Sequence, residues 1–230
     1  MSIADNLARV RDRIAAACAR VGRDPREVRI VAVTKTHPPE IVAAAVAVGV
    51  DAIGENRVQE AAAKRPLVVG TTPWHLVGPL QRNKAKLALE LFDLVETLDR
   101  AELADRLEML LGSEGRALPV FIEVNVGGET QKTGIPPAAA SSLVEQVLAR
   151  CPHLRLSGLM TVPPYHLDPE RSRSHFATLR GLATDLTTRF GLPPLELSMG
   201  MSDDFEVAVE EGATWVRLGR VLFGERRTMP

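Results

Sequence analysis

The sequence has few cysteines, no excess of either charge and no long apolar run, and each shortage excludes a class of protein. Cys18 and Cys151 lie far apart and in no CxxC or Cys/His spacing, so we expect neither a disulfide framework nor a zinc site. The 28 Lys and Arg residues nearly balance 29 Asp and Glu residues without a block of like charge, which argues against a nucleic-acid-binding surface. No segment reaches the roughly 18 apolar residues of a membrane span, and no signal-peptide pattern opens the chain. We therefore expect a cytoplasmic protein with a small-molecule partner.

What the sequence does have is a regular alternation of apolar strands and helices. Apolar residues at helical spacing predict an amphipathic first helix from Ile3 to Val21 that ends near Gly22. Eight apolar runs follow, and each but the last precedes a helical stretch such as Pro39–Val48. The runs are Val28–Thr34, Val50–Ile53, His75–Val77, Leu94–Thr97, Val120–Val126, Leu154–Met160, Leu195–Leu197 and Thr214–Leu218. Eight such units without a hairpin signal predict an α/β fold, a parallel (β/α)8 TIM-type barrel with an extra N-terminal helix.

No linker divides the chain. It contains no Pro/Gly/Ser-rich stretch, low-complexity run or shift of composition, and the longest loop-like stretch, Pro163–Pro169, is short. A length of 230 residues fits one barrel. We therefore expect one domain over residues 1–230 and, since no extended apolar patch can be read from the sequence, a monomer.

Polar and glycine residues collect directly after the predicted strands, where barrels of this class place their sites. In strand order they are Thr34–His37, Gly54–Asn56, His75 with Gly78, Asn125 with the loop that carries Lys132, Met160 with Thr161, Ser198–Ser202 and Arg217–Arg220. We expect all of them to face one rim of the barrel. The histidines at 153, 166 and 175 show no metal-ligand spacing, so no metal is expected.

Lys35 directly follows the first apolar strand. A lysine at the mouth of a barrel is partly desolvated, which lowers its pKa and supplies the neutral amine that condensation with a carbonyl requires. Lys35 is therefore the natural candidate for a Schiff base. From position alone, however, a lysine that extends from a strand end into solvent is the more common outcome.

The loops after the seventh and eighth strands predict a phosphate site. Ser198–Asp204 has the pattern of a strand end, a glycine loop and a helix start with Ser202 as N-cap, and Gly219–Arg220 follows the next strand. Backbone N–H groups converge at this place in many barrels and bind phosphate. Two ordinary capped turns explain the same residues equally well.

Three further polar residues have a structural alternative beside the functional one. Arg217 lies near the inner end of the last strand, where a buried charge needs either a carboxylate or a ligand. Asn56 follows Glu55 and, taken in isolation, fits a helix N-cap better than a pocket residue. His37 and His75 fit structural histidines better than functional ones.

Six motifs in one order give the sequence a resemblance to a known family. They are VAVTKT at 31–36, GENRVQE at 54–60, WHLVGPLQRNK at 74–84, SGLM at 157–160, LSMGMSDD at 197–204 and VRLG at 216–219. Together they resemble the YggS/PROSC family of pyridoxal 5'-phosphate (PLP) homeostasis proteins, whose fold is similar to the barrel domain of alanine racemase. The resemblance runs from the first predicted strand to the last.

The resemblance implies a PLP site made of residues in these motifs. Lys35 forms the internal aldimine with PLP, Ser198 contributes a hydroxyl to the phosphate, and backbone groups of Gly219 and Arg220 complete the phosphate site. Arg217 matches the arginine that contacts the pyridine nitrogen in alanine-racemase-like sites. Asn56, Met160 and Met199 complete the predicted cofactor-binding set. Lys132 matches a family lysine in the loop after the fifth strand, with a regulatory or PLP-transfer role.

The sequence departs from the family at two positions. His37 stands where family members often carry a second lysine, which weakens or alters a transfer role at that position. Arg220 stands where a threonine often follows the last glycine, so a hydroxyl contact to phosphate is lost while a cation that can reach the same phosphate is gained.

The resemblance implies a carrier or buffer that yields PLP to apoenzymes, with little or no turnover. An arginine stays charged and holds the pyridine nitrogen unprotonated, which weakens PLP as an electron sink. Alanine racemase takes its second base as a tyrosine from a further domain and the partner subunit, whereas eleven residues follow Gly219 here and Tyr165, the single tyrosine, sits in a different loop. Two enzyme alternatives remain: a low-activity PLP-dependent amino-acid racemase, and a class I aldolase-like enzyme that uses Lys35 without PLP.

Overall fold

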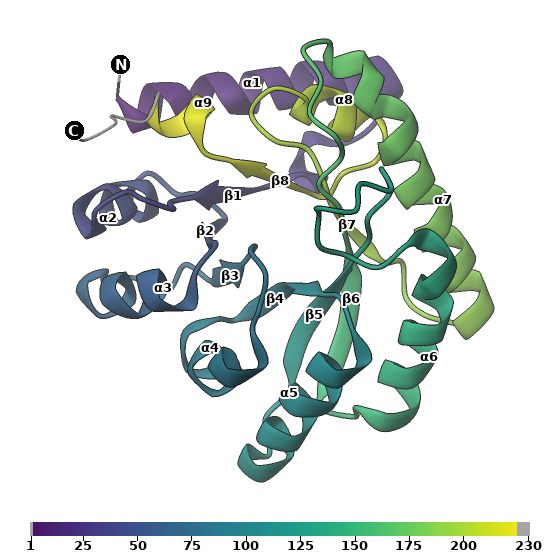
Figure 1. The fold of residues 1–230 in the computed structure, drawn as a ribbon. Coiled ribbons are helices and arrows are strands. Elements are labelled where there is room, and N and C mark those ends of the chain that lie inside the picture. The colour runs from purple at the N-terminus through teal and green to yellow at the C-terminus, as the bar shows by residue number, and fades with distance from the viewer. Residues whose placement is uncertain (1, 225–230) are drawn as a thin grey trace.

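Eight parallel strands close into a barrel in the computed structural model, which describes residues 2–224 (Figure 1). The strands pair in chain order and β8 closes on β1. They are β1 Arg29–Val33, β2 Ala52–Glu55, β3 Trp74–Leu76, β4 Leu94–Leu98, β5 Leu118–Glu123, β6 Leu154–Met160, β7 Glu196–Ser198 and β8 Trp215–Leu218. The predicted (β/α)8 barrel is confirmed, whereas the assignment of the whole chain to one domain stays a prediction.

Helices surround the barrel and bury the outer faces of its apolar strands (Figure 1). They are α1 Ile3–Val21, α2 Pro39–Ala47, α3 Val58–Lys64, α4 Ala85–Leu91, α5 Ala101–Glu114, α6 Ala140–Arg150, α7 Arg173–Phe190, α8 Phe205–Glu210 and α9 Arg220–Phe223. Short 3-10 turns cover Pro25–Glu27, Arg65–Leu67, Arg82–Lys84, Pro137–Ala139 and Pro169–Ser172. No helix within residues 2–224 is long and apolar enough to cross a bilayer.

The extra N-terminal helix α1 forms as predicted and packs beside α8 and α9 (Figure 1). Ser2 and Asp5 form a capping box at its start, and Gly22 ends it in the left-handed conformation at φ 70°. The amide of Asn6 donates to the carbonyl of Leu222 at 2.7 Å, which ties α1 to α9. The helix therefore covers the barrel where the last strand meets the first.

Most strand boundaries differ from the prediction by one to three residues, and those of β2 and β5 differ most. β2 extends through Gly54 and Glu55 because Gly54 pairs with Val33, and a Cβ at Gly54 would lie only 2.7 Å from a methyl of Val31. β5 ends at Glu123, so residues 124–136 form a longer loop than the stretch Pro163–Pro169. The last strand is followed by the short helix α9, which was not predicted.

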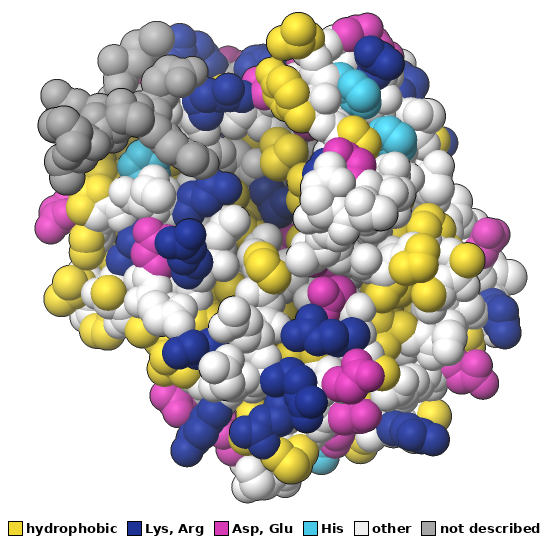
Figure 2. All heavy atoms as spheres, viewed as in Figure 1, with side chains coloured by type: hydrophobic (Ala, Val, Ile, Leu, Met, Phe, Trp, Pro, Cys, Tyr) yellow, Lys and Arg dark blue, Asp and Glu magenta, His cyan; other side chains and the backbone are white. Residues whose placement is uncertain are grey.

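Basic and acidic side chains are interspersed over the face seen in Figure 2, with apolar groups between them. The core consists of aliphatic and aromatic side chains, but charged side chains are buried in the molecule as well. Glu55, Glu96 and Arg217 are all buried on strands. A buried charge requires a partner or a ligand, so these three residues indicate where a functional site lies.

Candidate functional site

The carboxyl ends of the strands open into a cavity of about 610 Å³. Its volume is that of a small-molecule pocket. Five of the predicted site residues line it, namely Lys35, Asn56, Arg217, Gly219 and Arg220. The barrel therefore brings together, at one mouth, residues that lie up to 185 positions apart in the chain.

Lys35 is half-buried in the turn after β1, and the residues on both sides of it are held by acidic side chains. The Thr34 hydroxyl donates to Glu55 Oε1 at 2.7 Å, and the backbone N–H of Thr36 donates to Glu60 Oε1 at 2.7 Å. Lys64 Nζ donates to the Thr34 carbonyl at 2.8 Å and to Glu55 at 2.7 Å, and it lies 3.4 Å from Glu60. We call Thr34, Glu55, Glu60 and Lys64 the lysine-side network.

Thr36 has φ 68°, the single positive φ of a non-glycine residue among residues 2–224. A β-branched side chain in this region is strained and persists where its surroundings impose it. The hydrogen bond from Thr36 to Glu60 supplies that constraint. The strained turn fixes the direction in which Lys35 leaves the strand.

Glu55 is fully buried within the lysine-side network. Burial raises the pKa of this carboxyl, and the hydrogen bonds from Lys64 and Thr34 oppose that rise without cancelling it. Its second oxygen, Oε2, is buried with no hydrogen-bond partner among the described residues. Glu55 is therefore only partly compensated.

Arg217 extends from β8 into the cavity, and a second network of buried residues holds its side chain in place. Its Nη1 donates to Ser198 Oγ at 2.7 Å, and its Nη2 donates to the Thr161 carbonyl at 2.7 Å. Ser198 Oγ lies 2.5 Å from Glu96 Oε2, and Glu96 Oε1 lies 2.8 Å from His75 Nδ1. We call His75, Glu96, Ser198 and Arg217 the arginine-side network.

The two charged members of this network shift in pKa for different reasons. Burial alone raises the pKa of Glu96, but the hydrogen bond and charge of His75, the charge of Arg217 and the Ser198 hydroxyl bring the pKa below its ordinary value. Burial lowers the pKa of Arg217, against the attraction of Glu96, Glu123 and Asp204. Arginine remains charged nonetheless.

The loops after β7 and β8 meet at the cavity, as predicted. Met201, Ser202 and Asp203 line it from one loop, and Gly219 and Arg220 from the other. The Val221 N–H donates to Ser202 Oγ at 3.3 Å, and Arg220 pairs with Asp203. A hydroxyl, a cation and the start of a short helix thus lie side by side.

Two predicted helix caps are wrong. Ser202 does not cap α8, because a turn at Met201–Asp204 delays the helix and makes Asp204 the N-cap residue. The Asp204 carboxylate accepts the Met201 N–H at 2.7 Å and stabilises that turn. Likewise the N-cap of α3 is Arg57 and not Asn56, which lines the cavity instead.

Several residues lie elsewhere than the sequence suggested. Met160, Ser198 and Met199 are fully buried and do not line the cavity. Lys132 does not line it either, because its Nζ donates to the Pro163 carbonyl at 2.8 Å and pairs with Glu129 at 2.5 Å.

Two residues that were not among the predicted site residues line the cavity. His37 was expected on the rim but in a structural role, and Tyr165 was expected in a different loop. The loop after β6 brings Tyr165 to the mouth because that loop starts at the same rim as the others. His75, by contrast, is structural as expected, since it is buried against Glu96 and Trp215.

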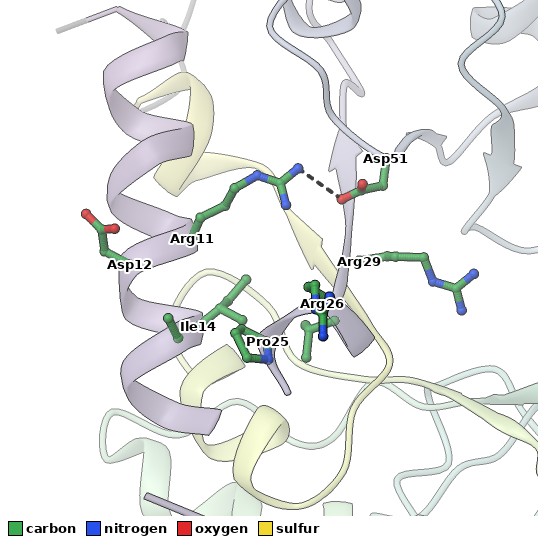
Figure 3. Close-up of a pocket in the computed structure, with 9 residues that line it drawn as sticks. Arg11, Asp12, Ile14, Pro25, Arg26, Arg29 and Asp51 are labelled. Carbon is green, nitrogen blue, oxygen red and sulfur yellow. Dashed lines mark hydrogen bonds and ion pairs between the residues drawn. The ribbon is translucent and has the colours of Figure 1, made fainter. Parts of the chain in front are cut away.

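A second cavity, of about 480 Å³, lies between α1 and the segment that leads into β1 (Figure 3). Its arginines are paired with acidic residues: Arg11 with Asp51 at 3.4 Å, and Arg26 with Asp24 at 2.6 Å. None of the predicted site residues lines it. The chemistry of the chain therefore converges at the cavity around Lys35 and Arg217.

Comparison with solved structures gives the same barrel. PipY of Synechococcus elongatus, solved with PLP bound, is 36% identical, with a TM-score of 0.84 over 97% of this chain and 100% of that one. A protein of unknown function from Bifidobacterium adolescentis is 37% identical, with a TM-score of 0.88 over 96% of this chain and 94% of that one. Alanine racemase of Clostridium difficile, at 16% identity and a TM-score of 0.75, covers 97% of this chain and shares the fold over 60% of its own length.

Comparison with related sequences extends over nearly the full length of the chain. The pyridoxal phosphate homeostasis protein of Aquifex aeolicus is 42% identical over 99% of this chain and 100% of the relative. That of Escherichia coli is 42% identical over 97% of both. The family model of the alanine racemase N-terminal domain matches residues 6–227. The resemblance read from the six motifs is confirmed, and the chain belongs to the alanine racemase N-terminal domain family and, within it, to the pyridoxal phosphate homeostasis proteins.

Proposed function

We propose that this protein binds PLP at Lys35 and serves PLP homeostasis as a carrier or buffer, with little or no turnover of its own. The observation that carries the proposal is that Lys35 and Arg217 line one cavity together with the loops after β7 and β8. The names of the full-length relatives and the PLP bound to PipY support it.

The donor set of the cavity fits the three polar ends of PLP. Bound PLP supplies an aldehyde, which a neutral lysine amine can condense with. Lys35 is the residue that would condense with the aldehyde, and Arg217 is the residue that would contact the ring nitrogen. Gly219, Arg220 and the neighbouring hydroxyl of Ser202 are the groups for the phosphate, where backbone N–H groups and a cation suit an anion.

The remaining predicted residues have supporting places in this proposal. Asn56 lines the cavity between Lys35 and the mouth residues of β3, so it can contact the cofactor directly. Met160 and Met199 pack in the interior behind the cavity, and Ser198 contacts Arg217 rather than the open space. Ser198 therefore acts on the phosphate site only through the arrangement of the loop after β7.

Arg217 is also the reason to propose binding rather than turnover. An arginine beside the ring nitrogen keeps that nitrogen unprotonated, and PLP is then a weak electron sink. A reactive aldehyde held on a lysine is masked until a stronger acceptor removes it. We accordingly propose a monomeric cytoplasmic protein whose acceptors are PLP-dependent apoenzymes, with Lys132 in a regulatory or transfer role beside the mouth.

The absorption spectrum of the purified protein tests the cofactor assignment. We expect a visible band from bound PLP that is lost in Lys35→Ala and kept in Lys132→Ala, because Lys132 does not line the cavity. A wild-type protein that acquires no band with added PLP, or a Lys35→Ala protein with an unchanged band, would contradict the assignment.

One observation favours a second candidate function, a low-activity amino-acid racemase. Racemization needs an acid–base group on each face of the substrate, and Tyr165 lines the same cavity as Lys35. A chiral assay with several L-amino acids separates the two functions. We expect no exchange above the level given by free PLP; exchange that disappears in both Lys35→Ala and Tyr165→Phe would establish the racemase instead.

A further inference from the structure

A carboxylate from the far side of the barrel reaches the base of the cavity. Glu96 lies on β4 and Arg217 on β8, and these strands are opposite one another in a closed ring of eight. Both side chains are buried, and Arg217 Nη1 lies 4.0 Å from Glu96 Oε2. Ser198, at the end of β7, bridges them.

The direction of each hydrogen bond in this bridge is fixed by chemistry. A guanidinium only donates and an ionised carboxylate only accepts, so the Ser198 hydroxyl accepts from Arg217 and donates its one proton to Glu96. The Ser198 proton is therefore used in a hydrogen bond inside the barrel. Ser198 thereby transmits the position of Glu96 to the guanidinium.

The charge of Glu96 is maintained although the residue is fully enclosed. His75 approaches its other oxygen at 2.8 Å and packs edge-on against Trp215, with ring centroids 4.8 Å apart. These contacts and the charge of Arg217 hold the pKa of Glu96 below its ordinary value. The network therefore places one buried negative charge beside the buried guanidinium of Arg217.

We propose that Glu96 is a positioning residue for the ring nitrogen of PLP, acting through Ser198 to fix the guanidinium of Arg217. This inference rests on the proposed function. The Thr161 carbonyl holds Nη2 of the same guanidinium, so Glu96 and Thr161 together set its orientation. Removing the charge of Glu96 weakens the Ser198 anchor of Arg217 and leaves the Thr161 anchor unchanged.

The test compares PLP with an analogue in which a C–H replaces the ring nitrogen. For Glu96→Gln we expect an affinity for PLP about 10-fold lower than that of the wild type, the scale of a weakened charge-assisted hydrogen bond. We expect no comparable change for the deaza analogue, which lacks the atom that Arg217 contacts. The visible circular dichroism of the bound PLP should change as well.

Glu123→Gln is the matched control. Glu123 is a buried carboxyl on the neighbouring strand β5, and its hydrogen bond is to Thr133 at 2.6 Å rather than to Ser198 or Arg217. This variant keeps the Ser198 bridge and loses only a charge that attracts Arg217 without a hydrogen bond, so we expect it to weaken PLP binding far less than Glu96→Gln. Equal weakening of Glu123→Gln and Glu96→Gln would overturn the inference.

Three outcomes separate this inference from the function on which it rests. A wild-type protein that binds no PLP refutes the proposed function itself. Wild-type binding with an unchanged Glu96→Gln affinity, or with equal losses for PLP and the deaza analogue, refutes the positioning role alone. If Glu96→Gln does not fold, Ser198→Ala keeps both charges and breaks the bridge, and it must show the same preference for weakening PLP over the analogue.

Discussion

Two buried networks flank the cavity, and they hold their functional side chains in different ways. The lysine-side network forms hydrogen bonds to the backbone around Lys35, at the Thr34 carbonyl and the Thr36 N–H. On the arginine side, the hydrogen bonds hold the Arg217 side chain itself, through the Ser198 hydroxyl of the network and the nearby Thr161 carbonyl. The first network thus holds the backbone on both sides of the lysine, whereas the second holds the arginine side chain itself.

The carboxylates at the centres of the two networks also differ. Glu55 and Glu96 are both fully buried, yet the pKa of Glu55 is raised and that of Glu96 is lowered. Within residues 2–224, one oxygen of Glu55 has no hydrogen-bond partner, while each oxygen of Glu96 has one. Burial raises the pKa of both acids, and only around Glu96 do the donors and charges together outweigh it.

Removing the cation of the lysine-side network should have the largest effect. Lys64→Met leaves Glu55 enclosed without its charged partner, and we expect the free energy of unfolding to fall by about 3 kcal/mol. Urea denaturation measures the change. The double variant Lys64→Met/Glu55→Gln should recover most of the loss, since no unpaired charge remains; an equal loss in the double variant would show that packing, and not charge, is responsible.

The two carboxylates should respond to pH in opposite directions. The folded pKa of Glu96 lies below its ordinary value of 4.5, so its contribution to stability is present above that pH and is lost as the pH falls through the folded pKa. The folded pKa of Glu55 lies above 4.5, so its contribution is present below that pH and is lost as the pH rises through the folded pKa.

Glu96→Gln and Glu55→Gln make this difference measurable. We expect Glu96→Gln to be the less stable variant by about 1–2 kcal/mol at about pH 7, and the gap to narrow at about pH 4. Urea denaturation of both variants at the two pH values tests it. If the difference in free energy of unfolding between the two variants grew on acidification, it would show that the pKa shifts of Glu55 and Glu96 are the reverse of those assigned here.

Changes in the loops after β7 and β8 should have smaller effects than changes in either network. Arg220 is exposed and paired with Asp203, so we expect Arg220→Ala to weaken PLP binding about 3-fold at low salt, and less at high salt because ions screen exposed charges. Titration with PLP at two salt concentrations measures the change. Arg26→Ala, another exposed arginine paired with an aspartate but in the other cavity, should leave affinity unchanged at both.

The strained turn beside Lys35 should give the smallest change. In Thr36→Gly the relief of a positive φ offsets the greater chain entropy of glycine, so we expect the free energy of unfolding to change by less than about 1 kcal/mol. Chemical denaturation measures it. A loss well above that value would mean that the Thr36 side chain, and not the backbone bond to Glu60, maintains the turn.

The sequence predicted the barrel well because its signals are local and repeated. Apolar β-branched runs and helical spacing place the strands to within a few residues, and the rule that sites lie at strand ends leads to Lys35 and Arg217. Boundaries failed where packing continues a strand past its apolar run, as at Gly54.

The supporting residues of the site were harder to predict for a physical reason. Glu96 lies within an apolar run, and nothing near it in the sequence indicates that it faces Arg217, 121 positions away. Ser198 and Ser202 lie in one motif, yet the strand turns one inward and leaves the other at the cavity. A charged residue inside an otherwise apolar strand is the one signal that could have found Glu96.

The central claim is that Lys35 is the residue that holds PLP. Reduction of the PLP-loaded protein with borohydride, followed by intact-mass measurement and peptide mapping, tests it most directly. We predict one adduct per chain, on the peptide that contains Lys35. An adduct on Lys132 alone, or no adduct at all, would contradict the account.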